Sequence, residues 1–333
     1  MSARKIAVCV MSRANYGRLK SVLQNIENNP FLELQLILGA SFYNAEVPFP
    51  VVARIQCLLN SDDNEGMALT TGILLQQITH EFQRLKPDIV LVHGDRYEML
   101  ACAIAASYLN IPLAHTEGGE QSGCIDDKVR NAISQLADIH LVTTTASAQR
   151  LNKPNTHIVG SPALDILTTC DLSHIDTIPY FLILCHPITT KSENIDPLID
   201  ALKCFDIRKI WINPNVDAGN KQILKKIHTQ DVTFMKDLPP EDYYRLLNNC
   251  KCAIGNSSSF IKEGSYLGSP VVLIGDRQIH RETWSNVVFA NNNKHDIVKK
   301  IQYQLTQNQI KSSLFGDGTA GEKITAILAK VEL

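Results

Sequence analysis

The sequence lacks several features that would place it in a simple class. No apolar run approaches the roughly 18 residues of a membrane-spanning helix, and the first residues show no signal-peptide pattern. No long Lys/Arg run is present, and 32 basic against 34 acidic residues give a net charge of −2. We therefore expect a cytoplasmic protein that binds neither membrane nor nucleic acid.

A disulfide framework and a zinc site are also not indicated, although the chain has nine cysteines. Cys9, Cys102, Cys185 and Cys252 lie within or beside apolar runs, where a thiol packs as a small core side chain. Cys250 is separated from Cys252 by one residue, without CxxC spacing or a nearby second pair. We expect reduced thiols and no bound metal.

What the sequence does contain is an alternation of short apolar runs with longer segments of helical periodicity. This alternation is typical of parallel strands covered by helices, and 333 residues suit two domains of about 150 residues each. The expected strands are Ile6–Met11, Leu34–Leu38, Ile89–His93, Ile111–Ala114, Ile139–Thr143 and His157–Val159, then Phe181–Cys185, Ile210–Asn213, Cys252–Gly255 and Val271–Ile274.

The apolar periodicity lapses around Asp171–Pro179, which we take as the domain boundary. The expected units are an N-terminal Rossmann-like domain (1–172), a C-terminal Rossmann-like domain (178–318) and a terminal helix (319–333) that packs back on the first domain. Two such domains place a cleft between the carboxyl ends of their sheets.

Acidic residues gather where this cleft is expected. HTEGGEQSGCIDDKVRN, residues 115–131, contains Glu117 and Asp126, and the preceding strand ends in HGDR with Asp95 and Arg96. Neighbouring carboxylates in a desolvated cleft raise one another's proton affinity, so one can be protonated while another is ionised. This predicts acid/base catalysis. The alternative is a solvated acidic loop that caps the next helix.

The second half offers groups for a phosphate. Ser257 and Ser258 follow a strand and begin a helix, where free N–H groups and hydroxyls bind phosphate, although Ser is also a common N-cap. Glu263, farther inside this helix, is suited to a ribose diol or, alternatively, only favours the helix dipole. Arg277 and His186 each follow a strand and are expected to face the same cleft.

The loop SRANYG, which joins the first strand to the first helix, lacks the GxGxxG spacing of dinucleotide sites. Arg13 in this loop is therefore expected to contact a phosphate and not NAD.

The motifs SRANYG, HGDR, HTEGGEQSGCIDD, HP, NPNVDAG, GNSSS and GDRQIHRET together resemble those of the hydrolysing UDP-N-acetylglucosamine 2-epimerases, in order and spacing. The resemblance extends from Arg13 to FGDG at Phe315–Gly318. It implies a GT-B-like architecture with the nucleotide mainly against the second domain.

The resemblance also implies the conversion of UDP-GlcNAc and water to N-acetylmannosamine and UDP, in sialic acid-type sugar biosynthesis. A base removes the proton at C2 as UDP leaves, 2-acetamidoglucal forms, and water adds with inversion at C2. No nicotinamide, other cofactor or metal is implied, and a homodimer or homotetramer is expected.

The same resemblance assigns residues to the reaction. The essential carboxylates are Asp95, Glu117 and Asp126, with Glu117 our first assignment for proton transfer at the sugar. The substrate-binding positions are Arg13, Arg96, His186, Asn215, Ser257, Ser258, Glu263 and Arg277.

Three departures from the family pattern are expected on the sugar side. These three are substitutions: Asn15 replaces an aspartate, and Ser41 and Asn131 replace histidines. In addition, the loop FYNAEVPFPVV is short. One explanation is another sugar, such as a 2,4-diacetamido-2,4,6-trideoxy sugar nucleotide of the legionaminic acid pathway. The others are a non-catalytic nucleotide-sugar-binding protein and a GT-B glycosyltransferase, which would need an acceptor.

Overall fold

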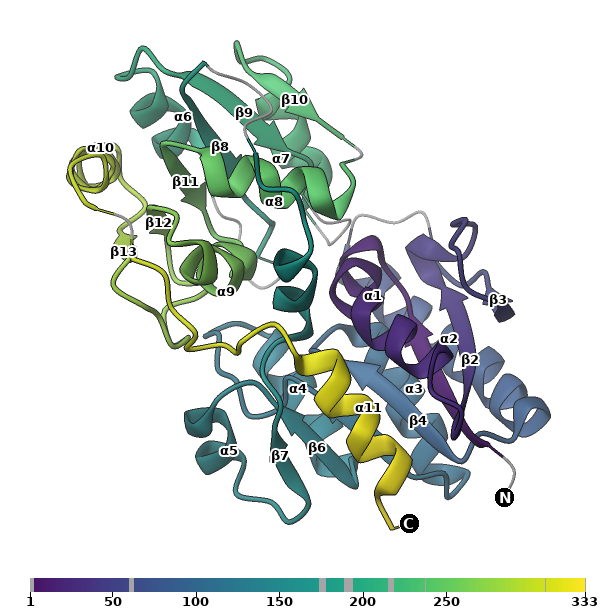
Figure 1. Ribbon diagram of the computed structural model, residues 1–333. Helices are drawn as coiled ribbons and strands as arrows, with labels where there is room; N and C mark the ends of the chain where they lie inside the picture. The colour runs from purple at the N-terminus through teal and green to yellow at the C-terminus, as the bar shows by residue number, and fades with distance from the viewer. Residues whose placement is uncertain are drawn as a thin grey trace.

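The computed structural model describes residues 3–59, 63–173, 178–188, 194–214, 219–236, 238–308 and 310–332. These residues form two parallel sheets covered by helices, one in each half of the molecule (Figure 1). Within the described ranges, the first sheet has seven strands in the order β3-β2-β1-β4-β5-β6-β7, and the second has six in the order β10-β9-β8-β11-β12-β13.

The bounds of the elements are as follows. The first sheet contains β1 (Arg4–Val10), β2 (Leu32–Gly39), β3 (Val51–Ile55), β4 (Ile89–His93), β5 (Leu113–Thr116), β6 (Ile139–Val142) and β7 (Thr156–Ile158). Its helices are α1 (Arg13–Glu27), α2 (Asn64–Leu85), α3 (Tyr97–Tyr108), α4 (Asp126–Leu136) and α5 (Thr145–Leu151), with short 3₁₀ helices η1 (Ala40–Phe42) and η2 (Pro162–Thr168).

The second sheet contains β8 (Tyr180–Leu184), β9 (Arg208–Ile212), β10 (Thr233–Met235), β11 (Cys252–Gly255), β12 (Val271–Ile274) and β13 (Val287–Ala290). Its helices are α6 (Asp196–Leu202), α7 (Asn220–Ile227), α8 (Pro240–Asn249), α9 (Ser258–Leu267) and α10 (Lys294–Gln304), and α11 (Ala320–Lys330) follows. No helix in the described part of the chain is long and apolar enough to cross a membrane.

Strand β1 shows why the first sheet is buried on both faces. Its alternate residues enter two separate cores: Ala7 and Cys9 pack on one face, and Ile6, Val8 and Val10 on the other. Residues of α2 and α3 contribute to the first core, and residues of α1 and α11 to the second. A continuous apolar run is the sequence pattern that such a doubly covered parallel strand requires.

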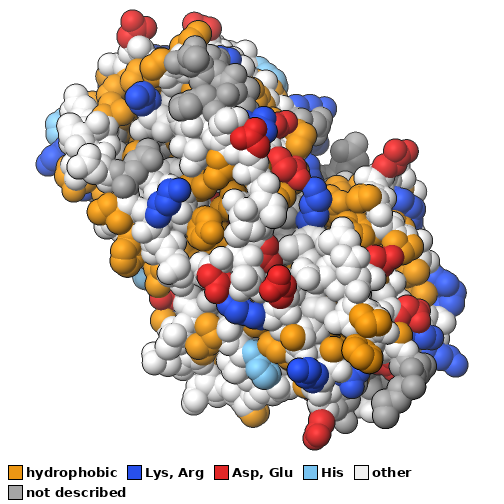
Figure 2. Space-filling model, in the orientation of Figure 1, with side chains coloured by type: hydrophobic (Ala, Val, Ile, Leu, Met, Phe, Trp, Pro, Cys, Tyr) orange, Lys and Arg blue, Asp and Glu red, His pale blue; other side chains and the backbone are white. Residues whose placement is uncertain are grey.

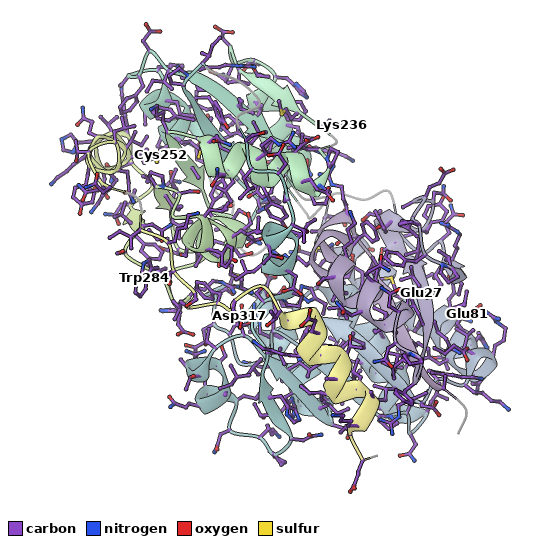
Figure 3. All side chains as sticks on the ribbon, viewed as in Figure 1. Glu27, Glu81, Lys236, Cys252, Trp284 and Asp317 are labelled. Carbon is purple, nitrogen blue, oxygen red and sulfur yellow. The ribbon has the colours of Figure 1, made fainter. Side chains whose placement is uncertain are left out.

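Helix α11 lies on the first half, although the chain reaches it from the second (Figure 1). Asp317, labelled in Figure 3, lies just before this helix, where the chain has returned. Ile324 and Leu328 are fully buried in the core that α1 also enters, and Asp165 of η2 accepts hydrogen bonds from the first N–H groups of α11. The terminal helix is thus an integral part of the first half.

The cysteines lie where the sequence predicted, but three strands were missed. All nine cysteines are free, and Cys9, Cys102, Cys185 and Cys252 are buried, as core residues should be. The sequence missed β3, β10 and β13, and β3 begins inside the segment FYNAEVPFPVV that we expected to be a loop. These strands are short and partly exposed, so they lack the continuous apolar run of a central strand.

Candidate active site

A cavity of about 800 Å³ lies between the two halves, at the ends of β1, β4 and β5 in one sheet and of β8, β11 and β12 in the other. Both strand orders change direction here, between β1 and β4 and between β8 and β11, which is where doubly wound sheets bind ligands. In the space-filling view, acidic and basic side chains both reach the surface near this junction (Figure 2).

The cavity brings together ten of the eleven candidate residues that the sequence singled out. They are Arg13, Asp95, Arg96, Glu117, Asp126, His186, Ser257, Ser258, Glu263 and Arg277. The eleventh, Asn215, lies outside the described residues. Among the departures, Asn15 and Ser41 line the cavity, but Asn131 is on the exposed face of α4, so our placement of Asn131 near the sugar was wrong.

Glu117 is held in the loop after β5 with its two carboxylate oxygens in different surroundings. Its side chain is buried, the residue being 4% exposed, and Oε1 lies 2.7 Å from Lys262 Nζ and accepts a hydrogen bond from Ser161 Oγ at 3.0 Å. Oε2 lies 3.8 Å from Nε2 of His93, another residue that lines the cavity. One oxygen is therefore fixed from behind, and the other remains on the cavity side.

The charge state of Glu117 follows from its neighbours. Burial raises the pKa of this carboxyl, but Lys262 first, then His93 and Arg18, lower it by more, so that the pKa lies well below its usual range. Glu117 is therefore a carboxylate at neutral pH. A desolvated carboxylate with one oxygen available is suited to accept a proton from a bound ligand.

His93 presents a second proton acceptor beside Glu117. Its Nδ1 lies 2.7 Å from Thr116 Oγ1, and this hydroxyl donates to the carbonyl of Val92 at 3.3 Å. In the tautomer that this chain of hydrogen bonds favours, Nδ1 carries the proton and Nε2 has a lone pair, and the described residues provide no hydrogen-bond partner for Nε2. Burial lowers the pKa of His93 to about 4, so the ring is neutral at neutral pH.

Asp95 is paired with a cation that the sequence analysis did not select. Arg130 of α4, which is 1% exposed, forms ion pairs with Asp95 and Asp127 and donates to the carbonyl of Glu120 at 2.9 Å. Burial raises the pKa of Asp95, but Arg130 and Arg281 lower it by more, and the pKa lies well below its usual range. Asp95 is therefore a second carboxylate at the cavity wall.

Glu120, the second acid of the segment TEGGE (residues 116–120), does not line the cavity. It accepts from Thr143 Oγ1 at 2.6 Å, is paired with Arg281, and lies 2.7 Å from Lys262 Nζ. The turn that separates Glu117 from Glu120 needs Gly119, whose φ is +75° and whose added Cβ would lie 2.2 Å from the carbonyl oxygen of Ser147. The acidic loop thus places Glu117 at the cavity and Glu120 in the ion pairs behind it.

The loops after β8 and β11 form the opposite wall. The His186 N–H donates to Asn256 Oδ1 at 2.7 Å, and Asn256 Nδ2 donates back to the His186 carbonyl at 2.9 Å. Ser257 is the N-cap of α9, and its hydroxyl accepts from the N–H of Ser259. Arg277 donates to the carbonyl of Asn256 at 3.0 Å, which places its positive charge beside the N-terminus of α9. A helix N-terminus with adjacent hydroxyls and an arginine is suited to a phosphate.

Glu263 lies deeper on the same helix and differs from the other acids. It is buried, and its Oε2 has no hydrogen-bond partner among the described residues. Burial raises the pKa of Glu263 to about 7, although Arg18 opposes the shift. Arg18 reaches over from α1 and donates to Ser258 Oγ at 3.1 Å. An oxygen in this position can accept the hydrogen bonds of a ribose diol.

Glu263 gives the molecule a specific dependence of stability on pH. Because the folded-state pKa of about 7 exceeds the ordinary 4.5, the folded form binds this proton more tightly than the unfolded chain. The stabilisation is present at low pH and is lost as pH rises through 4.5 to 7. Above neutral pH, the free energy of unfolding of Glu263→Gln is therefore expected to exceed that of the native protein by an amount on the order of 3 kcal/mol. The variant should accordingly unfold at a higher temperature.

The measurement is thermal unfolding of both proteins across this pH range. The two midpoints should converge toward pH 4.5 to 5, where the native carboxyl is protonated in the folded state. A difference that is the same at all pH values would contradict a raised pKa for Glu263.

Comparison with known proteins identifies the family. The profile described as UDP-N-acetylglucosamine 2-epimerase matches residues 24–329, which is most of the chain. The chain belongs to the UDP-N-acetylglucosamine 2-epimerase family. Within this epimerase family, a Legionella pneumophila protein named UDP-N,N'-diacetylbacillosamine 2-epimerase (hydrolyzing) is 32% identical over 99% of this chain and 97% of its own length. A Neisseria meningitidis UDP-N-acetylglucosamine 2-epimerase is 30% identical over 90% of this chain and 87% of its own.

Solved structures of the epimerase family share the fold. The Methanocaldococcus jannaschii UDP-GlcNAc 2-epimerase in complex with UDP-GlcNAc and UDP superposes with a TM-score of 0.84 at 18% identity, covering 97% of this chain and 99% of the other. The Neisseria meningitidis UDP-GlcNAc 2-epimerase bound to UDP-GlcNAc gives 0.78 at 17% identity, covering 97% and 99%. The epimerase therefore has the GT-B-like architecture that the sequence predicted, with two Rossmann-like halves around a central cleft.

Proposed function

We propose that this epimerase hydrolyses a UDP-activated 2-acetamido sugar with inversion at C2, and that UDP-GlcNAc, giving N-acetylmannosamine and UDP, is the first substrate to test. The observation that carries the proposal is the pair of differently placed oxygens of Glu117, one fixed by Lys262 and Ser161 and one on the cavity side. Such a carboxylate is oriented to take one proton from one position of a bound sugar.

The proposed first step is an elimination. Glu117 takes the proton from C2, the C1–O bond to UDP breaks, and a C1=C2 double bond forms to give the 2-acetamidoglucal. The leaving diphosphate carries the negative charge, which the N-terminus of α9 and the guanidinium of Arg277 can stabilise. No electrons are gained or lost overall, so the step needs no redox cofactor.

The proposed second step is hydration of the glucal. The water oxygen bonds to C1 and gives up one proton to a neighbouring base, while a proton adds to C2 from the face opposite to the one that lost it, so the product is the C2 epimer. A second acid/base group must deliver this proton. Asp95 and Asp126 both line the cavity and are the candidates for these two proton transfers.

We place the nucleotide against the second half. The N-terminus of α9, where the diphosphate would bind, is surrounded by Ser257, Ser258 and Arg277. His186 lies beside them, with its Nε2 3.3 Å from Ser257 Oγ. Glu263 would hold the ribose diol with its available oxygen. Arg13, whose Nη1 donates to the carbonyl of Lys236 in the opposite half at 3.2 Å, would approach the phosphates from the first half. Lys236 is labelled in Figure 3.

A second candidate substrate is a UDP-2,4-diacetamido-2,4,6-trideoxy sugar. Apolar side chains of Phe42, Met67, Ile125 and Val129 line the part of the cavity that the first half contributes, and they suit a C6 methyl group and a second acetamido methyl. The Legionella relative and a Campylobacter jejuni relative, 29% identical over 89% of this chain, are both named for N,N'-diacetylbacillosamine.

The test is to incubate the purified epimerase with each of the two sugar nucleotides in the absence of any acceptor and to measure UDP release. Release from either one supports hydrolysis, and the ratio of the two kcat/KM values assigns the sugar. Release only after a sugar or lipid acceptor is added would replace the proposal with a glycosyltransferase. Binding without release would indicate a non-catalytic protein.

A further inference from the structure

A buried lysine of the second half contacts the proposed base from behind. Lys262 of α9 is 2% exposed, and its Nζ lies 2.7 Å from Glu117 Oε1 and 2.7 Å from Glu120 Oε1. The helix belongs to the second half, and both glutamates belong to the loop after β5 in the first. Lys262 is not among the residues that line the cavity, so it would act on a substrate only through Glu117.

We propose that Lys262 is a positioning residue that keeps Glu117 ionised and oriented for proton abstraction, and that it does so only while the two halves are closed. The inference rests on the proposed function. If the halves separate, α9 carries Lys262 away from both glutamates, because the two ion pairs that its ammonium group makes in the described part of the chain both cross to the first half. Closure around the substrate would then be the step that prepares the base.

The need for this cation follows from the charges around Glu117. Three acids face it, namely Glu120 on its own loop, Asp95 after β4 and Glu263 on α9. The groups that lower the pKa of Glu117 are Lys262 first, then His93 and Arg18. His93 is neutral at neutral pH because burial lowers its pKa to about 4. Without Lys262, Glu120 would still be paired with Arg281, whereas Glu117 would be left with Arg18 as the remaining cation that lowers its pKa, and Glu117 would be the one to take up a proton.

Orientation depends on the same contact. Glu117 Oε1 is paired with the ammonium group of Lys262 and accepts a hydrogen bond from the Ser161 hydroxyl. These two donors together fix the plane of the carboxylate, so that Oε2 lies on the side of His93. Ser161 alone would leave the group free to rotate. Loss of Lys262 should therefore reduce both the fraction of ionised Glu117 and the precision of its placement.

The test compares Lys262→Met with Lys20→Met. Lys20 of α1 forms a 2.6 Å ion pair with Glu241 of α8 and also joins the two halves, but both partners are partly exposed and neither lines the cavity. Lys262→Met is expected to lower kcat by about 10²-fold or more, with a much smaller change in KM. It should also move the acidic limb of the kcat profile upward by at least about one pH unit. Lys20→Met should leave both unchanged.

Two outcomes would overturn the proposal. One is an acidic limb that stays in place in Lys262→Met, and the other is an equal loss in Lys20→Met, which would mean that any contact between the halves has this effect. If Lys262→Met does not fold, as judged by UDP binding, Lys262→Gln keeps a hydrogen-bond donor without the charge and is expected to show the same shift of the limb.

A readout without turnover separates this inference from the proposed function. In protein labelled with ¹³C at the glutamate carboxyls, Glu117→Gln identifies the resonance of Glu117, and its titration can be followed in native and Lys262→Met protein. The pKa of Glu117 should rise clearly in the variant. An unchanged titration would reject the role of Lys262 even if neither sugar nucleotide were a substrate, whereas a raised pKa in an inactive protein would leave only the reaction in question.

Discussion

Glu117→Gln is expected to lower kcat by about 10²- to 10⁴-fold, the range that a positioned general base contributes. Glutamine retains the shape and can still accept from Ser161 and Lys262 through its carbonyl oxygen, so the loop should remain in place. It cannot take up the C2 proton. The dissociation constant of UDP should stay nearly unchanged because the groups proposed to bind the nucleotide lie on the opposite wall, around the N-terminus of α9.

The measurement is steady-state UDP release together with calorimetric titration of UDP. Glu81→Gln is the matched control, since this glutamate is paired with Arg84 on the surface of α2 and does not line the cavity (Figure 3). The control should behave as the native enzyme does. Native turnover in Glu117→Gln would remove this residue from the mechanism, and loss of UDP binding together with turnover would indicate a structural defect instead.

Arg130→Met is expected to destabilise the fold by about 3–5 kcal/mol, the usual effect of removing one member of a buried ion pair. Arg130 is the cation between Asp95 and Asp127 and also donates to the carbonyl of Glu120. Methionine fills much of the volume but leaves Asp95 without its main partner, so the pKa of Asp95 should rise as well. Activity should then be lost at the acidic end of the pH range before it is lost at neutral pH.

Thermal unfolding checks the first effect, and the pH profile of kcat checks the second. Lys323→Met is the control, because its 3.0 Å ion pair with Asp317 is exposed and contributes about 0–1 kcal/mol. An Arg130→Met midpoint no lower than that of Lys323→Met would show that the buried ion pairs contribute little to stability. An unmoved pH profile would separate Asp95 from catalysis.

The part of the fold that was predictable is the part that depends on local pattern. Strands such as β1 and β4 are buried on both faces, so their apolar runs predict both their position and their parallel pairing. Strands β3, β10 and β13 lie toward or at the sheet edges and are only partly buried, so their sequences do not differ from loops. The pairing of these strands is decided by their neighbours and not by their own residues.

The candidate site divides in a similar way. Residues that directly follow a strand, such as Asp95, Glu117 and Arg277, could be selected because chain order alone places them at the carboxyl edge of a sheet. Lys262 and Arg130 could not, because the contacts that place them behind the cavity, Lys262 with Glu117 and Arg130 with Asp95, join residues that are distant in sequence. A weak signal for Lys262 was present in the segment SSFIKEG, which begins α9 and places this lysine directly after the apolar pair Phe-Ile. A lysine in such a buried segment requires a charged partner.

The central claim is that this epimerase removes and replaces the C2 proton of the sugar while water replaces UDP. NMR of the native enzyme with the better of the two sugar nucleotides, in deuterated water and without acceptor, tests this most directly. The account predicts free UDP and a C2-inverted sugar that carries deuterium at C2. Release of UDP with an unlabelled, uninverted sugar would contradict it, because the C2–H bond would then have stayed intact and the reaction would be a simple hydrolysis.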